Sequence, residues 1–214
     1  MKSIKVFRRA FFHSAVAEKC IAPGHPMMDA EITSMQIIHM IGMDAAEYAK
    51  KEMHRQVNRP PQCRQCRSNG SLRALGFYSR SSTASTTGSI VVIKVRRFVC
   101  QACRKTTSLL PSFAQPYRLI CSVTIQRHFE SAPATLDTYR WRFLLRRYFK
   151  KFRAWLPELA AQLGHIFGLP PPTAHNDPWK LLTKTWPGAG LGATTHQMVD
   201  QFQITIFGKY RCHG

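Results

Sequence analysis

Two pairs of cysteines constrain the fold of this chain more than any other feature of its sequence. Cys63 and Cys66 form the first pair, Cys100 and Cys103 form the second, and 33 residues separate the pairs. Zinc takes four tetrahedral ligands, and a tight turn lets both thiolates of a Cys-x2-Cys pair point at one ion. Four protein thiolates fill the coordination shell, so we predict one structural Zn²⁺ ion with no open position for catalysis.

Two other uses of paired cysteines fit this sequence less well. A redox-active dithiol stands as a single pair at a helix start within a βαβ unit, and the sequence shows no such unit. A disulfide framework needs an oxidising compartment, and neither the odd number of cysteines nor a secretory signal favours one. We expect the remaining cysteines to be buried thiols, namely Cys20, Cys121 and Cys212.

The segments between and after the cysteine pairs have the composition of strands. Residues Ser71 to Arg80 and Ile90 to Val99 are rich in β-branched and aromatic side chains, and a Ser/Thr/Gly loop from Ser81 to Ser89 joins them. A third short strand is predicted at Thr106 to Leu110. This order of turns and strands is that of a zinc ribbon. A segment of about 50 residues is too small to fold on its own core, so the metal would supply much of its stability.

Helices are predicted on both sides of the ribbon. Their ranges are Met35–Met53, Ser122–Ser131, Asp137–Trp155, Glu158–Phe167 and Ala193–Phe202, with a short strand after the last at Gln203–Phe207. In the third helix, apolar residues recur with helical spacing from Trp141 to Trp155, which predicts a buried stripe. Thr135 or Asp137 is expected to cap this helix, and Pro157 to end it and begin the next.

The fold class that we predict is α+β, with a small β zinc ribbon flanked by α-helices and a helix-rich C-terminal half. Five regions follow from the composition: a basic N-terminal arm, expected to be disordered, at 1–26; a helical segment at 27–59; the ribbon at 60–118; a basic helical region, similar to a helix-turn-helix, at 119–168; and a Pro/Gly-rich linker and tail at 169–214.

The charge of the chain predicts a polyanionic partner. Lys and Arg number 31 against 11 Asp and Glu, which gives a formal net charge of +20 and excludes acidic classes of protein. Residues 60–118 hold ten basic and no acidic residues, whereas a solvated surface ordinarily mixes both signs. DNA, RNA and an anionic membrane surface are all polyanionic, and we expect nucleic acid and not a membrane as the partner. No uncharged apolar run reaches the roughly 18 to 20 residues of a membrane-spanning helix.

The basic residues near the ribbon and on the following helix are the predicted nucleic-acid contacts. They are Lys94, Arg96, Arg97, Arg104, Lys105, Arg140, Arg142, Arg146, Arg147, Lys150 and Lys151. Strand alternation places Lys94 and Arg96 on one face of the ribbon and Arg97 on the other. Such side chains contact phosphates more often than base edges. A solvated helix face and a helix lying on a membrane surface remain alternatives for the basic helix.

The run from Cys63 to Leu119, ending in IVVIKVRRFVCQACRKTTSLLPSFAQPYRL, resembles the zinc ribbon of bacterial insertion-sequence transposases. In that family a CPxCG-type turn precedes an R(R/Y)xCxxCxRTFS segment. The chain is also similar to uncharacterised bacterial proteins in which the ribbon continues into LLPSFxxPYR, a degenerate helix-turn-helix and a DPW…FGxYRCH tail. The matching tail residues here are 177–179 and 207–213. Arg67 departs from the family's Gly in the first turn, and Thr107 from its Phe after the second.

The resemblance implies a DNA-binding protein related to transposase accessory domains. We therefore expect a non-catalytic zinc-ribbon protein that binds nucleic acid, with duplex DNA favoured, in the bacterial cytoplasm at the nucleoid, as a homo-oligomer or beside a partner transposase. One alternative is a catalytic transposase, whose carboxylates would hold two metal ions and would include Asp137, Asp177 and Asp200. Another is a zinc-stabilised module that binds RNA or protein.

Overall fold

The computed structural model describes residues 34–130, 132–167, 179, 182 and 190–209. All of these residues belong to one compact unit, which begins at Glu31. Several predictions concern residues outside the described ones: the basic arm at 1–26, most of the linker after 169, Cys20, Cys212 and Asp177. None of the helices in the described part is long and apolar enough to cross a membrane.

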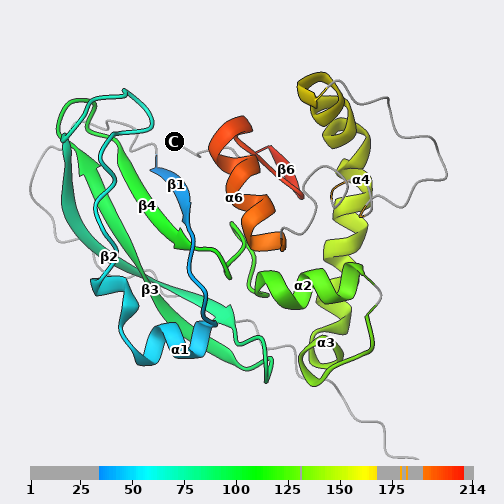
Figure 1. The fold of residues 1–214 in the computed structure, drawn as a ribbon. Coiled ribbons are helices and arrows are strands. Elements are labelled where there is room, and N and C mark those ends of the chain that lie inside the picture. The colour runs from blue at the N-terminus through cyan, green and yellow to red at the C-terminus, as the bar shows by residue number, and fades with distance from the viewer. Residues whose placement is uncertain (1–33, 131, 168–178, 180–181, 183–189, 210–214) are drawn as a thin grey trace, which may run out of the picture. The chain divides into compact units, whose positions relative to one another are not determined.

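A four-stranded sheet forms the first half of the described fold (Figure 1). Its strands are β1 (Ser34–His39), β2 (Leu72–Thr83), β3 (Ile90–Cys100) and β4 (Thr106–Pro111), in the spatial order β1-β4-β3-β2. β3 pairs antiparallel with both β2 and β4, and a bulge lies in β2 between Ala74 and Gly76. The three strands that the sequence predicts around the cysteines are therefore confirmed.

The prediction of a helix over Met35–Met53 is wrong in its first half. Residues Ser34–His39 form β1, which pairs parallel with β4, and helix follows only in α1 (Ala45–Lys50) and the 3-10 turn η1 (Met53–Arg55). Ile38 is buried on one face of the sheet and Ile37 packs on the other. An apolar run covered on both faces is typical of a parallel strand and has no helical period to distinguish it.

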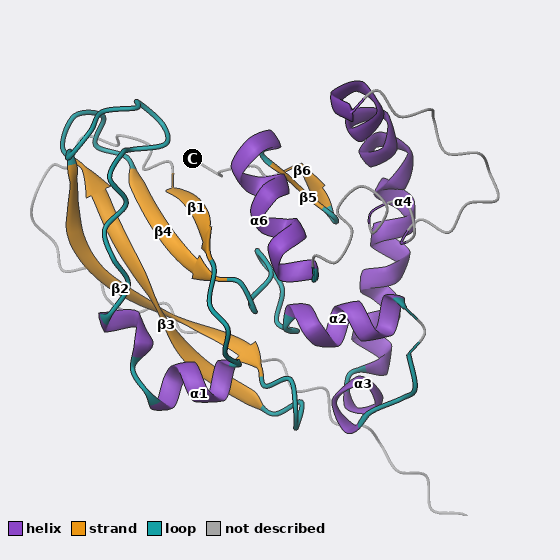
Figure 2. Cartoon of the chain, viewed as in Figure 1, coloured by secondary structure: helices purple, strands orange, loops and turns teal. Residues whose placement is uncertain are grey.

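Helices make up most of the second half (Figure 2). They are α2 (Ser122–Phe129), α3 (Leu136–Arg140), α4 (Arg142–Phe167) and α6 (Leu191–Phe202), followed by a small antiparallel pair, β5 (Ile204–Thr205) and β6 (Gly208–Lys209). The described residues thus have a mixed α and β composition that agrees with the predicted α+β class.

Two boundaries in the basic helical region differ from the prediction. The helix that was expected from Asp137 to Trp155 is interrupted at Trp141, which separates α3 from α4. Pro157 does not end α4, which continues to Phe167. An internal proline leaves the carbonyl of Arg153 without its helical hydrogen bond and costs about 3 kcal/mol. Both residues are exposed, so water can reach that carbonyl, and Leu159 and Leu163 beyond the proline are buried in the core.

The predicted apolar stripe of the basic helix is confirmed as core. Leu145 and Phe152 of α4 are fully buried, and the ring of Phe152 stacks on Phe129 of α2 at 5.1 Å between ring centroids. Trp179 closes the same cluster edge-on against Phe129. A second cluster joins α1 to the sheet through Tyr48, whose hydroxyl donates to the carbonyl of Lys94 at 3.2 Å.

The tip of the β2–β3 hairpin packs tightly on α3. Residues 81–83, predicted as loop, belong to β2, so the connection is only Ala84–Ser89. The indole N–H of Trp141 donates to the carbonyl of Gly88 at 2.6 Å. Gly88 has φ +65°, and a Cβ at this position would lie 2.9 Å from the Cα of Asp137. Glycine is therefore required here by both backbone conformation and space.

Replacing Gly88 with alanine should lower the free energy of unfolding by about 1–3 kcal/mol, because the side chain forces both a left-handed backbone and a clash with α3. Chemical denaturation measures this directly. Gly42→Ala is the matched control: Gly42 is exposed and its added Cβ meets nothing within 4 Å, so its stability should be unchanged. Equal denaturation midpoints for the two variants would contradict the packing described here.

Candidate functional site

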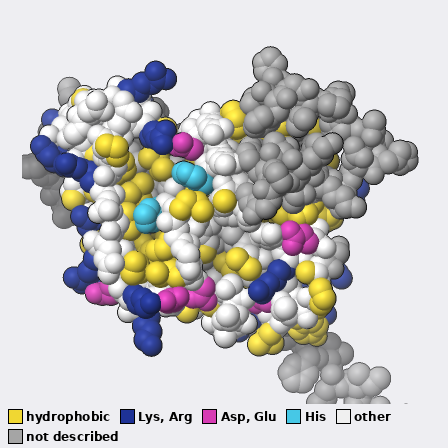
Figure 3. Space-filling model, viewed as in Figure 1, with side chains coloured by type: hydrophobic (Ala, Val, Ile, Leu, Met, Phe, Trp, Pro, Cys, Tyr) yellow, Lys and Arg dark blue, Asp and Glu magenta, His cyan; other side chains and the backbone are white. Residues whose placement is uncertain are grey.

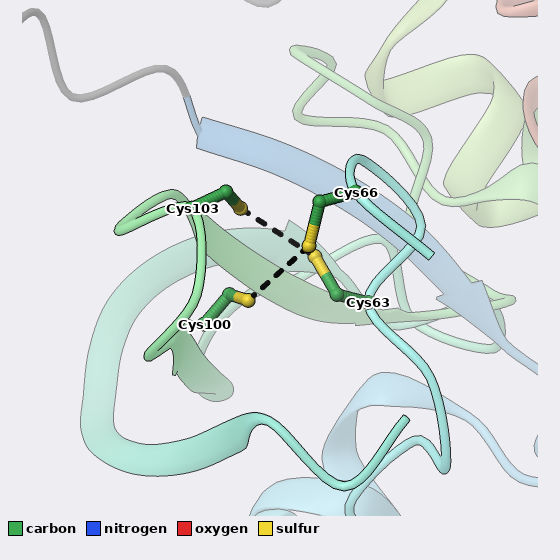
Figure 4. Close-up of side chains that lie close together, drawn as sticks. All are labelled: Cys63, Cys66, Cys100 and Cys103. Atoms are coloured by element: carbon green, nitrogen blue, oxygen red, sulfur yellow. Dashed lines mark hydrogen bonds between the residues drawn. The ribbon is translucent and has the colours of Figure 1, made fainter. Parts of the chain in front are cut away.

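The four predicted ligand cysteines converge on one point (Figure 4). Cys63 and Cys66 lie in the loop before β2, Cys100 ends β3, and Cys103 follows in the next turn. The sulfur of Cys63 is 3.8 Å from that of Cys103, the sulfur of Cys66 is 3.6 Å from that of Cys100, and all four lie within 4.8 Å of one another. The four thiolates could therefore hold a metal ion.

The two cysteine turns have the same backbone hydrogen bonds. In the first, the carbonyl of Cys63 accepts from the N–H of Arg67 at 2.8 Å; in the second, the carbonyl of Cys100 accepts from the N–H of Arg104 at 2.9 Å. The N–H of each leading cysteine donates in turn to a carbonyl five residues later. Arg67 and Arg104 occupy equivalent positions and have φ of 58° and 62°. The left-handed position explains why the resembling family has glycine where this chain has Arg67.

The cysteine cluster packs on apolar side chains, and polar groups of Ser71 form hydrogen bonds with the second cysteine turn. Cys63 and Cys100 are fully buried against Leu72, Phe98 and Leu109. The hydroxyl of Ser71 lies 3.1 Å from the sulfur of Cys100, and the N–H of Gln101 donates to the carbonyl of Ser71 at 2.9 Å. These contacts tie the second cysteine turn to the start of β2, so the geometry of the sulfurs is held by both strands.

The thiols have opposite ionisation tendencies. Burial alone would raise the pKa of Cys100, but the hydrogen bond from Ser71 and those from the backbone outweigh burial and lower that pKa to about 6. Burial raises the pKa of Cys103 to about 12, and the neighbouring sulfurs of Cys100, Cys66 and Cys63 act in the same direction. Neighbouring thiolates repel each other, so a cation at their centre is what would let all four ionise together.

Other titratable residues do not form a second centre within the described part of the chain, where these four cysteines are the only group of three or more His, Cys, Asp or Glu side chains placed to hold a metal. Cys121 is a buried thiol, as predicted, and contacts the hydroxyl of Thr124 at 3.1 Å. Asp137 is fully buried and accepts from Thr124 and Thr135, and Asp200 pairs with Arg64 at 2.8 Å. Both carboxylates therefore have structural partners.

The basic residues of β3 separate as strand alternation predicts. Lys94 is exposed, and the guanidinium of Arg96 lies over Phe77 at 4.7 Å and near Phe98 at 5.5 Å. Arg97 lies over the ring of Tyr78 on the opposite face, at 6.0 Å from its centroid. The two predicted contacts beside the second cysteine turn, Arg104 and Lys105, are exposed.

The remaining predicted contacts form one exposed set on α3 and α4, which we call the basic row. It consists of Arg140, Arg142, Arg146, Arg147, Lys150 and Lys151. Within the described residues, none of them forms an ion pair with a carboxylate. Arg142 instead lies over the rings of Tyr139 and Phe143, which are 63% and 66% exposed. These two exposed aromatic side chains lie outside the predicted apolar stripe, and the sequence analysis assigned them no role.

Sequence analysis also missed two arginines that line a cavity beside the sheet. Arg80 of β2 and Arg118 after β4 lie there together with Arg97. Arg118 belongs to the PYR part of the LLPSFxxPYR pattern, which was the one signal in the sequence that could have identified it. Arg80 belongs to no sequence motif, so only the fold shows that it lies near Arg97 and Arg118.

Residues 63–146 match the model of a family described as a domain of unknown function (DUF6431). The match begins at the first of the four cysteines and includes β2, β3, β4, α2, α3 and the start of α4. No curated protein and no solved structure matches the chain significantly.

Replacing Arg67 with glycine should raise the free energy of unfolding by up to about 1 kcal/mol, because glycine adopts the left-handed conformation without strain. The side chain of Arg67 is exposed. The side chain of Gln62 donates to the backbone carbonyl of Arg67, and this hydrogen bond does not require an arginine side chain. A shift in thermal melting temperature is the measurement. Gln65→Gly in the same loop lacks this benefit and should be neutral or destabilising. An equal loss of stability in both variants would refute the role assigned to φ.

Proposed function

We propose that this protein is a zinc-ribbon nucleic-acid-binding protein related to the accessory domains of transposases, with duplex DNA as its main partner. In this proposal the metal has a structural role, and the basic row supplies the principal contact with phosphates. The protein would act in the bacterial cytoplasm, at the nucleoid.

Zinc is the proposed metal because of the donor set and its spacing. Four thiolates in a tetrahedron suit Zn²⁺ or iron, and a structural zinc site leaves no coordination position open. Zinc–sulfur bonds of about 2.3 Å place sulfur atoms about 3.8 Å apart in a tetrahedron. The separations of 3.8 Å and 3.6 Å in the two measured pairs agree with that value. Cys63, Cys66, Cys100 and Cys103 would hold the ion, which would supply cross-linking rather than chemistry.

The observation that carries the nucleic-acid proposal is the like charge along the basic row. Arg142 and Arg146, Arg146 and Lys150, and Arg147 and Lys151 are four residues apart, so each pair of side chains shares one helix face about 5–6 Å apart. Like charges at this spacing destabilise a helix by about 0.2–0.5 kcal/mol per pair. If these charges served only solubility, we would expect carboxylates among them to offset the repulsion. Phosphates of a bound nucleic acid would offset it in the same way.

The position of the row on its helix supports the same proposal. The first turn of α4 contains no acidic residue, and Arg142 stands at its start, where the helix dipole disfavours positive charge. On the face shown in Figure 3, acidic side chains and Lys or Arg lie together along the edge near α1, and further Lys and Arg lie over the sheet. A phosphate backbone along α4 would compensate both unfavourable terms.

Replacing Cys100 with serine should remove about one equivalent of bound zinc and make the ribbon sensitive to protease, because three thiolates hold zinc far less tightly than four. Elemental analysis and limited proteolysis of the purified chain measure the two effects. Cys121→Ser is the control, since this thiol lies outside the cluster and the metal content should stay unchanged. Absence of any bound transition metal in the native protein would refute the zinc site, and iron would refute its identity.

If about six phosphates are neutralised, affinity for duplex DNA should fall roughly 10³-fold between 50 and 200 mM salt. Removing two charges in the double variant Arg146→Gln, Arg147→Gln should weaken binding and make the salt dependence shallower by about two phosphates. Arg55→Gln serves as the control, because Arg55 is exposed but paired with Glu52 at 3.0 Å. Fluorescence anisotropy with duplex DNA, single strands and structured RNA provides the measurements. A flat salt response would exclude the proposal, and a preference for RNA would replace DNA as the partner.

A further inference from the structure

A shallow, open depression with a volume of about 680 Å³ lies against the face of the sheet opposite to Arg96. Its lining includes Tyr78 and Arg80 of β2, Arg97 of β3, and Tyr117 and Arg118 of the loop after β4; we call it the arginine pocket. The volume is within the range of about 300–1,000 Å³ typical of sites for small ligands. Its described lining comes from the four strands of the sheet and the loop after β4, and includes neither the four clustered cysteines nor a residue of the basic row.

The described residues that line the arginine pocket are rich in positive charge. They include three arginines and no acidic side chain. Neither Arg97 nor Arg118 forms an ion pair with any carboxylate among the described residues. Two donors of lining residues, the hydroxyl of Tyr78 and Nε of Arg118, are buried and have no hydrogen-bond partner in the described part. Buried donors without acceptors are costly, so the pocket is built to receive an anion with several oxygens.

The arginines are held in place before any ligand arrives. Arg80 donates from Nη2 to the carbonyls of Gln115 and, at 2.7 Å, of Arg118, which ties the loop to β2. The guanidinium of Arg118 lies 4.8 Å from the ring centroid of Phe207 and 5.4 Å from that of Tyr148, and donates to the carbonyl of Tyr117 at 3.1 Å. Such preorganisation lowers the entropic cost of binding a ligand.

Tyr117 adds an aromatic surface at the same place. Its side chain is 53% exposed, and its backbone has φ of 57°, which is unusual for a bulky residue. The N–H of Arg118 closes the turn by donating to the carbonyl of Gln115 at 3.1 Å. Local strain of this kind persists where the surrounding structure holds it, and it occurs most often at functional sites. An exposed tyrosine ring is a surface on which a nucleobase can stack.

We propose that the arginine pocket binds a single nucleotide, with its phosphate on Arg97 and Arg118 and its base stacked on Tyr117. The proposal rests on the nucleic-acid binding proposed above, which supplies the ligand class. The nucleotide can belong to a strand whose base is unstacked, or be free in solution. Both share one phosphate and one base, and the pocket recognises that combination.

The test is isothermal titration calorimetry of the full chain with adenosine 5′-monophosphate, inorganic phosphate and a short single-stranded oligonucleotide. Adenosine monophosphate or the oligonucleotide should bind saturably, and more tightly than phosphate. Tyr117→Gly should weaken this binding about 5- to 150-fold by removing the stacked ring. Because glycine accepts φ of 57°, the same variant should keep or raise the melting temperature, which separates lost binding from lost folding.

Arg97→Gln should weaken nucleotide binding about tenfold or more by removing one charged donor. It is preferred over Arg118→Gln, since Arg118 also packs on the rings of Tyr148 and Phe207. Tyr117→Phe is the conservative control and should bind as the native chain does. Binding of the oligonucleotide without the monophosphate would assign the pocket to a strand, and binding of the monophosphate would assign it to free nucleotides as well.

Three results would overturn the proposal: no saturable binding of either nucleotide probe, unchanged binding in Arg97→Gln and Tyr117→Gly, or phosphate binding as tight as that of the nucleotide. Variants in the basic row distinguish a failure of the proposed function from a failure of the nucleotide site. The double variant Arg146→Gln, Arg147→Gln should lose duplex affinity and retain nucleotide binding. Tyr117→Gly should lose nucleotide binding and retain duplex affinity. If the native chain binds no duplex DNA, the proposed function fails while the titrations still decide the pocket.

Discussion

The convergence of four sulfur atoms at one end of the β2–β3 hairpin is the constraint on which the rest of the fold depends. The leading cysteine of the second pair is also the last residue of β3 and pairs with Leu72 at the start of β2, so the position of the cysteine cluster and the register of the strands are fixed together. Two turns with identical backbone bonding place the sulfurs, and the apolar cluster of Leu72, Phe98 and Leu109 lies directly beneath them. A divalent cation in the centre would offset the electrostatic repulsion among the thiolates and would cross-link the two turns.

The opposite end of the hairpin is held by contacts of another kind. There the carbonyl of Gly88 accepts from Trp141, and Asp137, buried beneath the turn, accepts from Thr124 and Thr135. The guanidinium of Arg127 lies 3.6 Å from the same carboxylate. A buried carboxylate with these donors joins α2 to the start of α3, and Arg127 also donates to the carbonyl of Ser85 in the hairpin tip. This explains why Asp137 is a structural residue despite its place among the candidate carboxylates. The hairpin is thereby connected at one end to the cysteine cluster and at the other to the helices.

Sequence patterns predicted the features that depend only on residues near one another in the sequence. The cysteine spacing, the β-branched composition of the strands and the helical period from Trp141 to Trp155 each identify an element without knowledge of its neighbours. The strand β1 could not be identified in this way, because its partner β4 lies about 70 residues further along the chain, and burial on both faces removes the alternation that marks a strand. The continuation of α4 through Pro157 likewise depends on the burial of Leu159 and Leu163, which outweighs a local helix-breaking signal. The arginine pocket combines residues from four strands and a loop, and no sequence window contains them all.

The two cationic regions of the molecule differ in physical character, and this difference favours different modes of binding. The basic row is exposed, its side chains are separated by about one helical turn, and water and salt screen each charge. Its attraction for phosphates, under the proposed function, would accordingly be additive and independent of sequence, as expected for contact with a backbone. In the arginine pocket, Arg118 is half-buried, and burial lowers its pKa, so less solvent competes for its charge. A guanidinium held over two aromatic rings in such a place selects the shape of the anion as well as its charge. A nucleic-acid strand could therefore be attracted by the row and positioned by the pocket, because the first interaction depends on many weak charges and the second on a few fixed ones.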